Sequence, residues 1–298
     1  MMSPNETTKV YEALNWASSF LEANQYERQI GDRLLQHHTG WTRTQLLTEL
    51  QTELTSTVHS QFVRDVELAA TGIPVQHITG NETFYGREYA VNQHVLIPRP
   101  ETEELIEAVL AAIDDLFADL AGKNQAEPLQ IIDVGTGSGI IAITLALELA
   151  HSRVLASDIS TEALAVAKRN ATNLAVNITF CEGDLLTPFL ESNEKASIIV
   201  SNPPYIPEGD RKEMKSNVTD HEPENALFAG GDGLDIYRRL VKQIPNILLT
   251  PGIVAFEIGH DQGESVRQLL ATELPTNADI QIINDINNNQ RIVLAKVK

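Results

Sequence analysis

Residues 129–139, LQIIDVGTGSG, decide the fold of this chain. The apolar run 129–134 is typical of a buried strand, and closely spaced glycines follow it directly. Small residues let the backbone approach a ligand, and a helix expected from Ile140 offers its positive N-terminus there. The stretch therefore predicts a strand, a ligand-binding turn and a helix.

The same alternation continues to the end of the chain. We predict strands at 129–134, 154–157, 178–181, 197–200, 253–258, 280–283 and 291–297, and helices at 140–150, 161–173, 234–249 and 262–272. Strands that alternate with helices predict a parallel, doubly wound sheet. The last two strands have only a short connection and are expected to be antiparallel. The predicted class is α/β, with a seven-stranded mixed sheet.

The first part of the chain has a different pattern. Residues 1–73 carry apolar stripes at helical spacing and predict a small helical bundle. Residues 74–97 predict a β-hairpin linker, with strand-like segments up to Ile97. A helix is expected over 101–121, and residues 98–298 form the predicted catalytic domain.

Composition excludes several classes of protein. The chain has 298 residues, 42% of them hydrophobic, which suits a globular protein with a sizeable core. It has no uncharged apolar run of ~18 residues and no apolar signal core, so we expect a cytoplasmic protein without membrane contact. A single cysteine, Cys181, fits a reducing compartment. The net charge of −19 disfavours a protein that grips phosphate backbones.

The glycine loop and two aspartates suggest an adenosine site. Ile140 stands where a dinucleotide fingerprint has its third glycine, and no lysine follows as in a P-loop. Asp158 ends the second strand, where a carboxylate reaches ribose hydroxyls; its alternative role is to cap the next helix, which Ser160 can do instead. Asp184 follows the third strand and could accept from an adenine amino group, or simply form a turn.

Asn202-Pro203-Pro204-Tyr205 follows the fourth strand. Because both prolines lack a backbone N–H, this loop offers mainly acceptors, the Asn202 side-chain oxygen and the Pro203 carbonyl, beside an aromatic ring. An ordinary turn is the alternative, but the carboxyl edge of such a sheet is where ligands bind. Two acceptors that hold one planar NH2 group are suited to amino methylation.

These motifs resemble class I S-adenosylmethionine-dependent methyltransferases that act on amino groups. Further segments are similar to the HemK/PrmC family, the glutamine methyltransferases of peptide chain release factors: 84–86, 96–103, 222–223, 226–227, 230–235 and 257–263. The resemblance covers roughly residues 74–298. One departure is the turn 287–289, which holds three asparagines where family members often have a glycine and an acid before the final strand.

The resemblance implies S-adenosyl-L-methionine as the cofactor and no metal. The implied cofactor-binding residues are Asp133, Gly135, Thr136, Gly137, Ser138, Gly139, Asp158, Asp184, Leu185 and Asn202. The implied catalytic residues are Asn202, Pro203 and Tyr205. Substrate binding would involve Asn202, Pro203, Pro204, Tyr205 and Arg99, with Phe84 and 99–102 lining the cleft; the alternative for Arg99 is a surface charge.

The expected activity is methylation of the glutamine in the Gly-Gly-Gln motif of release factors, with the helical bundle docking the protein substrate. We expect a monomer with no direct nucleic-acid partner. The alternatives are a ribosomal-protein glutamine methyltransferase, a nucleic-acid adenine methyltransferase, which the charge disfavours, and a non-catalytic adaptor that keeps only the fold.

Overall fold

The computed structural model describes residues 8–121, 128–212, 214 and 219–298. The chain divides into two compact units. The smaller comprises the described residues up to Asn81 together with 219–221, and the larger comprises those of 82–214 and 222–298. Within the described ranges, no helix is both long enough and apolar enough to cross a membrane.

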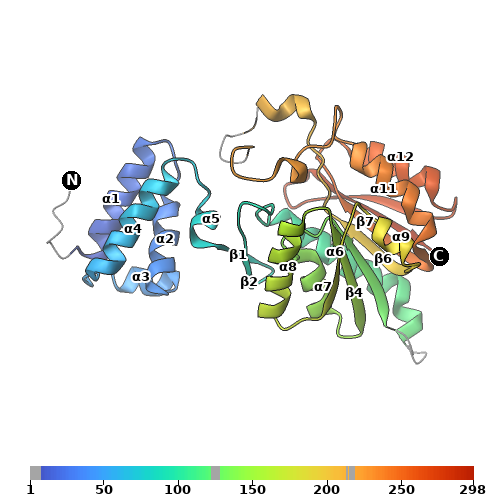
Figure 1. The fold of residues 1–298 in the computed structure, drawn as a ribbon, viewed down its shortest axis with the longest axis horizontal. Helices are drawn as coiled ribbons and strands as arrows, with labels where there is room; N and C mark the ends of the chain where they lie inside the picture. Colours follow the sequence, from blue (N-terminus) through green and yellow to red (C-terminus); the bar gives the residue numbers. More distant parts are fainter. Residues whose placement is uncertain (1–7, 122–127, 213, 215–218) are drawn as a thin grey trace. The chain divides into compact units, whose positions relative to one another are not determined.

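The small unit is helical, as the apolar stripes predict (Figure 1). Its helices are α1 (Val10–Ala23), α2 (Gln29–Thr39), α3 (Arg43–Thr48), α4 (Ser56–Ala69) and α5 (Val75–Thr79). Thr42 and Thr55 cap α3 and α4 by accepting from backbone N–H groups. We expected the helical part to end at residue 73. It continues to Asn81 because α5 adds Val75 and Ile78 to the same apolar core.

The large unit contains a seven-stranded sheet in the order β5-β4-β3-β6-β7-β9-β8. Its strands are β3 (Leu129–Val134), β4 (Ser152–Asp158), β5 (Ile178–Glu182), β6 (Ala196–Ser201), β7 (Leu248–Glu257), β8 (Asp279–Asn284) and β9 (Gln290–Val297). The first five are parallel, and β9 runs antiparallel to both β7 and β8. The predicted mixed sheet and its antiparallel last pair are confirmed.

Helices cover both faces of this sheet (Figure 1). Helices α6 (Glu101–Ala121), α7 (Ile140–Glu148) and α8 (Thr161–Asn173) pack on one face, and α9 (Thr187–Glu191), α11 (Asp235–Gln243) and α12 (Gly263–Glu273) pack on the other. Neighbouring residues of each strand serve opposite faces, so Ile131 joins the first core and Ile132 the second. Strand order reverses between β3 and β6, and the site lies at their carboxyl ends.

Several predicted bounds are shifted, among them the start of β7 at Leu248 rather than 253, and two regions differ most. The helix predicted over 234–249 ends at Gln243, because Pro245 lacks an amide hydrogen; a short 3-10 turn, η3 (Ile244–Asn246), leads into β7 instead. The linker hairpin consists of β1 (Asn81–Phe84) and β2 (Arg87–Ala90) only. Val91, Val95 and Ile97 are buried without forming a strand, since Pro98 follows them directly.

Candidate active site

The glycine loop after β3 is shaped as a cradle. Gly135, Gly137 and Gly139 all have positive φ, at 71°, 55° and 85°. The amides of Gly135 and Thr136 donate to the Ser157 carbonyl at 2.8 and 2.9 Å, which fixes the loop to β4. A Cβ added to Gly135 or Gly137 would meet nothing within 4 Å, so the loop borders open space that a ligand can fill.

Asp158 supports this loop from the end of β4. Its Oδ2 accepts from the Gly137 amide at 2.8 Å and its Oδ1 from the Ser160 amide at 2.9 Å. Ser160 caps α8 by accepting from the Ala163 amide, so Asp158 is not needed as the cap. Burial raises the pKa of Asp158, and the backbone N–H groups oppose that shift. The carboxylate lines the cavity with acceptor capacity to spare.

Asp133 lies elsewhere than we predicted. It is fully buried, and it does not line the cavity. Its Oδ2 accepts from the Thr136 hydroxyl at 2.6 Å and from the Ala142 amide at 3.1 Å, while its Oδ1 has no partner among the described residues. Burial raises its pKa to about 7. The structure therefore corrects its expected cofactor contact: Asp133 ties the loop to α7 from below.

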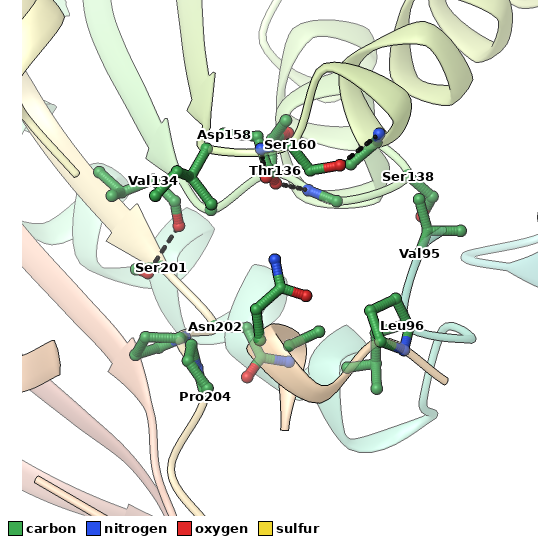
Figure 2. Close-up of a pocket in the computed structure, with 18 of the residues that line it drawn as sticks. Val95, Leu96, Val134, Thr136, Ser138, Asp158, Ser160, Ser201, Asn202 and Pro204 are labelled. Atoms are coloured by element: carbon green, nitrogen blue, oxygen red, sulfur yellow. Dashed lines mark hydrogen bonds between the residues drawn. The ribbon is translucent and has the colours of Figure 1, made fainter. Parts of the chain in front are cut away.

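The Asn202 loop faces the glycine loop across one cavity of about 290 Å³. Figure 2 shows Asn202 and Pro204 on one side of it and Thr136, Asp158 and Ser160 on the other. The Ser201 hydroxyl donates to the Val134 carbonyl at 2.6 Å, which joins the ends of β6 and β3. The two motifs that the sequence singled out thus share one site.

Among the described residues, only the NH2 end of the Asn202 side-chain amide has a hydrogen-bond partner. Its Nδ2 donates to the Thr102 hydroxyl at 3.2 Å, and that hydroxyl donates to Glu257 Oε2 at 2.7 Å. In the described part of the chain, no group donates a hydrogen bond to Asn202 Oδ1 or to the Pro203 carbonyl. Both residues line the cavity. Two acceptors are therefore left for a ligand.

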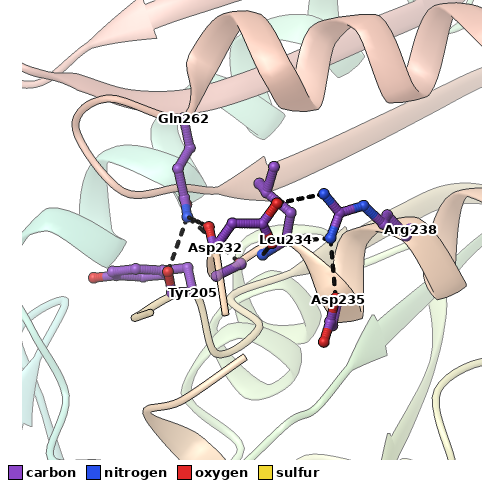
Figure 3. A network of polar contacts seen from close by, with 7 residues as sticks. Tyr205, Asp232, Leu234, Asp235, Arg238 and Gln262 are labelled. Carbon is purple, nitrogen blue, oxygen red and sulfur yellow. Dashed lines mark hydrogen bonds and ion pairs between the residues drawn. The ribbon is translucent and has the colours of Figure 1, made fainter. Parts of the chain in front are cut away.

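Tyr205 and Phe84 do not line the cavity, contrary to our expectation. The Tyr205 carbonyl accepts from Gln262 Nε2 at 2.9 Å, which turns this part of the loop toward the start of α12 (Figure 3). Its ring packs beside the core under α11 and α12, and burial raises its pKa to about 12. Phe84 is buried in the core on the other face of the sheet, edge-on to Tyr89.

Arg99 lines the cavity, but its guanidinium is engaged. It donates to Glu222 Oε1 at 2.6 Å, and Glu222 Oε2 accepts from the Ile97 amide at 3.2 Å. The Glu222 side chain is only 1% exposed. Arg99 therefore fastens the segment before α6 to the long loop after β6.

The third strand brings two more predicted residues to the cavity. Asp184 and Leu185 both line it. Asp184 forms an ion pair with Arg239 of α11. To bind an adenine amino group, its carboxylate would have to share its acceptor oxygens with that guanidinium. Leu185 adopts a positive φ of 54°, and its carbonyl accepts from the Ser157 hydroxyl at 2.8 Å.

Asn170 is a supporting residue that no sequence signal indicated, and the structure also describes the asparagine-rich turn. Asn170 of α8 donates to the carbonyls of Ser138, at 2.8 Å, and Ala90, at 3.0 Å. No local signal marks an asparagine inside a helix for this task. In the asparagine-rich turn 287–289, the Asp285 carboxylate accepts from the amides of Asn287 and Asn289 and pairs with Arg291. This turn does not line the cavity.

Comparison with known proteins agrees with this geometry. Residues 12–80 match the family model described as the PrmC N-terminal domain, and 116–243 match the methyltransferase small domain. A release factor glutamine methyltransferase of Bacillus anthracis is 46% identical over 97% of this chain and 100% of its own length. That of Bacillus subtilis is 44% identical over 97% of this chain and 98% of its own.

A solved methyltransferase from Pyrococcus furiosus shares the fold alone. It is 13% identical, with a TM-score of 0.50, over 82% of this chain and 99% of its own. The two Bacillus relatives match along nearly the whole length of the chain, which includes both units. The chain belongs to the release factor glutamine methyltransferase family.

Proposed function

We propose that this protein transfers a methyl group from S-adenosyl-L-methionine to the side-chain amide nitrogen of the glutamine in the Gly-Gly-Gln motif of release factors. One observation carries the proposal: Asn202 Oδ1 and the Pro203 carbonyl, two acceptors without a partner among the described residues, share a cavity with the glycine cradle. The family relatives are named for this substrate.

The residues present fit the cofactor. Gly135 and Gly137 leave open space against the cavity, and Asp158 has acceptor capacity for ribose hydroxyls. Ser138 adds polar groups to the same wall, whereas the amide and hydroxyl of Thr136 already donate to the Ser157 carbonyl and to Asp133. When bound there, S-adenosyl-L-methionine supplies an electrophilic methyl group on a sulfonium.

The Asn202 loop supplies orientation and electrostatic stabilisation. An amide nitrogen is a poor nucleophile because its lone pair is delocalised into the carbonyl. Asn202 Oδ1 and the Pro203 carbonyl would accept the two N–H groups and direct the lone pair at the methyl carbon. They favour the positive charge that develops on nitrogen, so they bind the transition state more tightly than the ground state. The product then loses its proton to water, so a dedicated base is unnecessary.

The remaining parts of the proposal concern partners and location. We assign the helical unit, which matches the PrmC N-terminal domain, to docking of the protein substrate. The enzyme would act as a monomer in the cytoplasm, on the machinery of translation termination. The net charge of −19 argues against direct binding of nucleic acid.

A transfer assay with labelled cofactor tests the proposal. The substrates are a release factor, the same factor with its Gly-Gly-Gln glutamine changed to alanine, a ribosomal protein mixture and adenine-containing DNA. We expect label on the unaltered release factor only. Label on DNA or on a ribosomal protein would identify one of the alternative enzymes, and cofactor binding without transfer to any substrate would favour the adaptor.

A further inference from the structure

We propose that Thr102 and Glu257 are positioning residues that fix which end of the Asn202 carboxamide faces the substrate. The inference rests on the proposed function and deepens it. The three residues come from the first turn of α6, the end of β7 and the loop after β6. Both supporting side chains belong to residues that are only 1% exposed.

An asparagine side chain needs such a device. The oxygen and NH2 ends of a carboxamide have nearly the same shape, so packing alone selects between them poorly. Only the oxygen end can accept an N–H from a substrate amide. With its NH2 end turned to the cavity, Asn202 would face the substrate NH2 group with hydrogen-bond donors, and no hydrogen bond could form. The choice of end must therefore come from hydrogen-bond polarity.

Two consecutive hydrogen bonds, from Asn202 to Thr102 and from Thr102 to Glu257, set that polarity. An ionised carboxylate only accepts, so the hydrogen of the Thr102 hydroxyl is committed to Glu257 Oε2 at 2.7 Å. The Thr102 oxygen is then left as an acceptor, and it takes the Asn202 NH2 group at 3.2 Å. Asn202 Oδ1 is thereby directed to the opposite side, where the cavity lies. A neutral Glu257 could instead donate to Thr102 and release this order.

The surroundings of Glu257 determine when it is ionised. Burial raises its pKa to about 7, and Glu101 of α6 adds to the shift. The Thr102 hydroxyl, Arg291 of β9 and the Asn202 amide oppose it. Tyr237 of α11 donates to the Glu257 backbone carbonyl at 2.6 Å and interacts with the carboxylate, as does Tyr205. The ordered state should therefore be lost as the pH falls through neutrality.

Four variants test the proposal in the methyl-transfer assay: Thr102→Val, Thr102→Ser, Glu257→Gln and Thr144→Val as a matched control. Thr144 is a buried threonine whose hydroxyl bonds to the Tyr89 hydroxyl at 2.9 Å, away from the cavity. We expect Thr102→Val to lower kcat about tenfold to a hundredfold, with an unchanged Kd for S-adenosylmethionine. Thr102→Ser keeps the hydroxyl and should retain most of the wild-type kcat. Thr144→Val should lose about as much thermal stability as Thr102→Val while its kcat stays at the wild-type value.

The pH profile separates positioning from a merely structural role. Wild-type kcat should fall below about pH 7, whereas Glu257→Gln should have a lower kcat without this acid limb. The proposal is overturned if Thr102→Val keeps wild-type kcat, if Thr144→Val loses as much, or if Glu257→Gln keeps the limb. A wild-type enzyme that fails to methylate the release factor would instead refute the proposed function itself.

Discussion

Replacing Asp133 with asparagine should change how the stability of the protein depends on pH. The carboxyl group is fully buried under the glycine loop, with one oxygen bonded to Thr136 and Ala142 and the other without a partner in the described part of the chain. Asparagine keeps the size and an acceptor but cannot ionise. The substitution therefore isolates the free-energy cost of the buried charge.

The magnitude follows from the pKa of Asp133, which burial raises from an ordinary 3.8 to about 7. A difference of about three pKa units corresponds to about 4 kcal/mol between the protonated and ionised states. Because the folded-state pKa is the higher one, the folded protein keeps this proton where the unfolded chain has lost it. The stabilisation is fully present below about pH 4 and is lost as the pH rises through about 7.

Urea unfolding of the wild type and of Asp133→Asn at a series of pH values measures this difference. Both tryptophans, Trp16 and Trp41, belong to the helical unit, so their fluorescence follows that unit, and circular dichroism is needed to follow the large one. Relative to wild type, Asp133→Asn should gain about 4 kcal/mol of unfolding free energy between about pH 4 and 8. A difference between the two proteins that is constant across this range would refute the argument.

Three further substitutions, with Arg153→Ala as the control for one of them, probe the loop and its supports. Gly139→Ala should destabilise the protein by about 1–3 kcal/mol in urea unfolding, because φ is +85° and an added Cβ would lie 3.0 Å from a neighbouring side-chain carbon. Arg99→Ala leaves the buried Glu222 without its cation and should cost about 1–3 kcal/mol in the same measurement, whereas Arg153→Ala breaks a more exposed ion pair and should cost about 0–1 kcal/mol. Equal losses of unfolding free energy in Arg99→Ala and Arg153→Ala would contradict the view that burial of Glu222 makes the Arg99 pair the more stabilising one. Asp158→Ala should weaken cofactor binding in calorimetry at least tenfold, since it removes both a ribose acceptor and the partner of a loop amide; an unchanged dissociation constant would place the ribose elsewhere.

Local patterns predicted most of the fold. The strand before the glycine loop, the helix from Glu101 and the cap at Ser160 depend on residues within a few positions of one another, and all three are found as expected. The alternation of strands with helices along the chain also predicted a sheet covered on both faces. Where a proline interrupted an apolar pattern, as at Pro245, the predicted helix was too long.

Contacts between distant residues could not be predicted in this way. Arg99 meets Glu222 across 123 positions, and Thr102 meets Glu257 across 155. The sequence marked each of these segments through its resemblance to a family, but not which side chains they bring together. Tyr205 is the clearest case: its place three residues after Asn202 suggested a wall of the site, yet Gln262, 57 positions away, holds its carbonyl and its ring packs against the core.

The central claim is that Asn202 Oδ1 and the Pro203 carbonyl hold the glutamine carboxamide for attack. Single-turnover methyl transfer by Asn202→Ala, at saturating S-adenosylmethionine and release factor, tests it most directly. We expect a rate lower by about tenfold to a thousandfold, with cofactor affinity nearly unchanged. A variant that transfers the methyl group at the wild-type rate would contradict it.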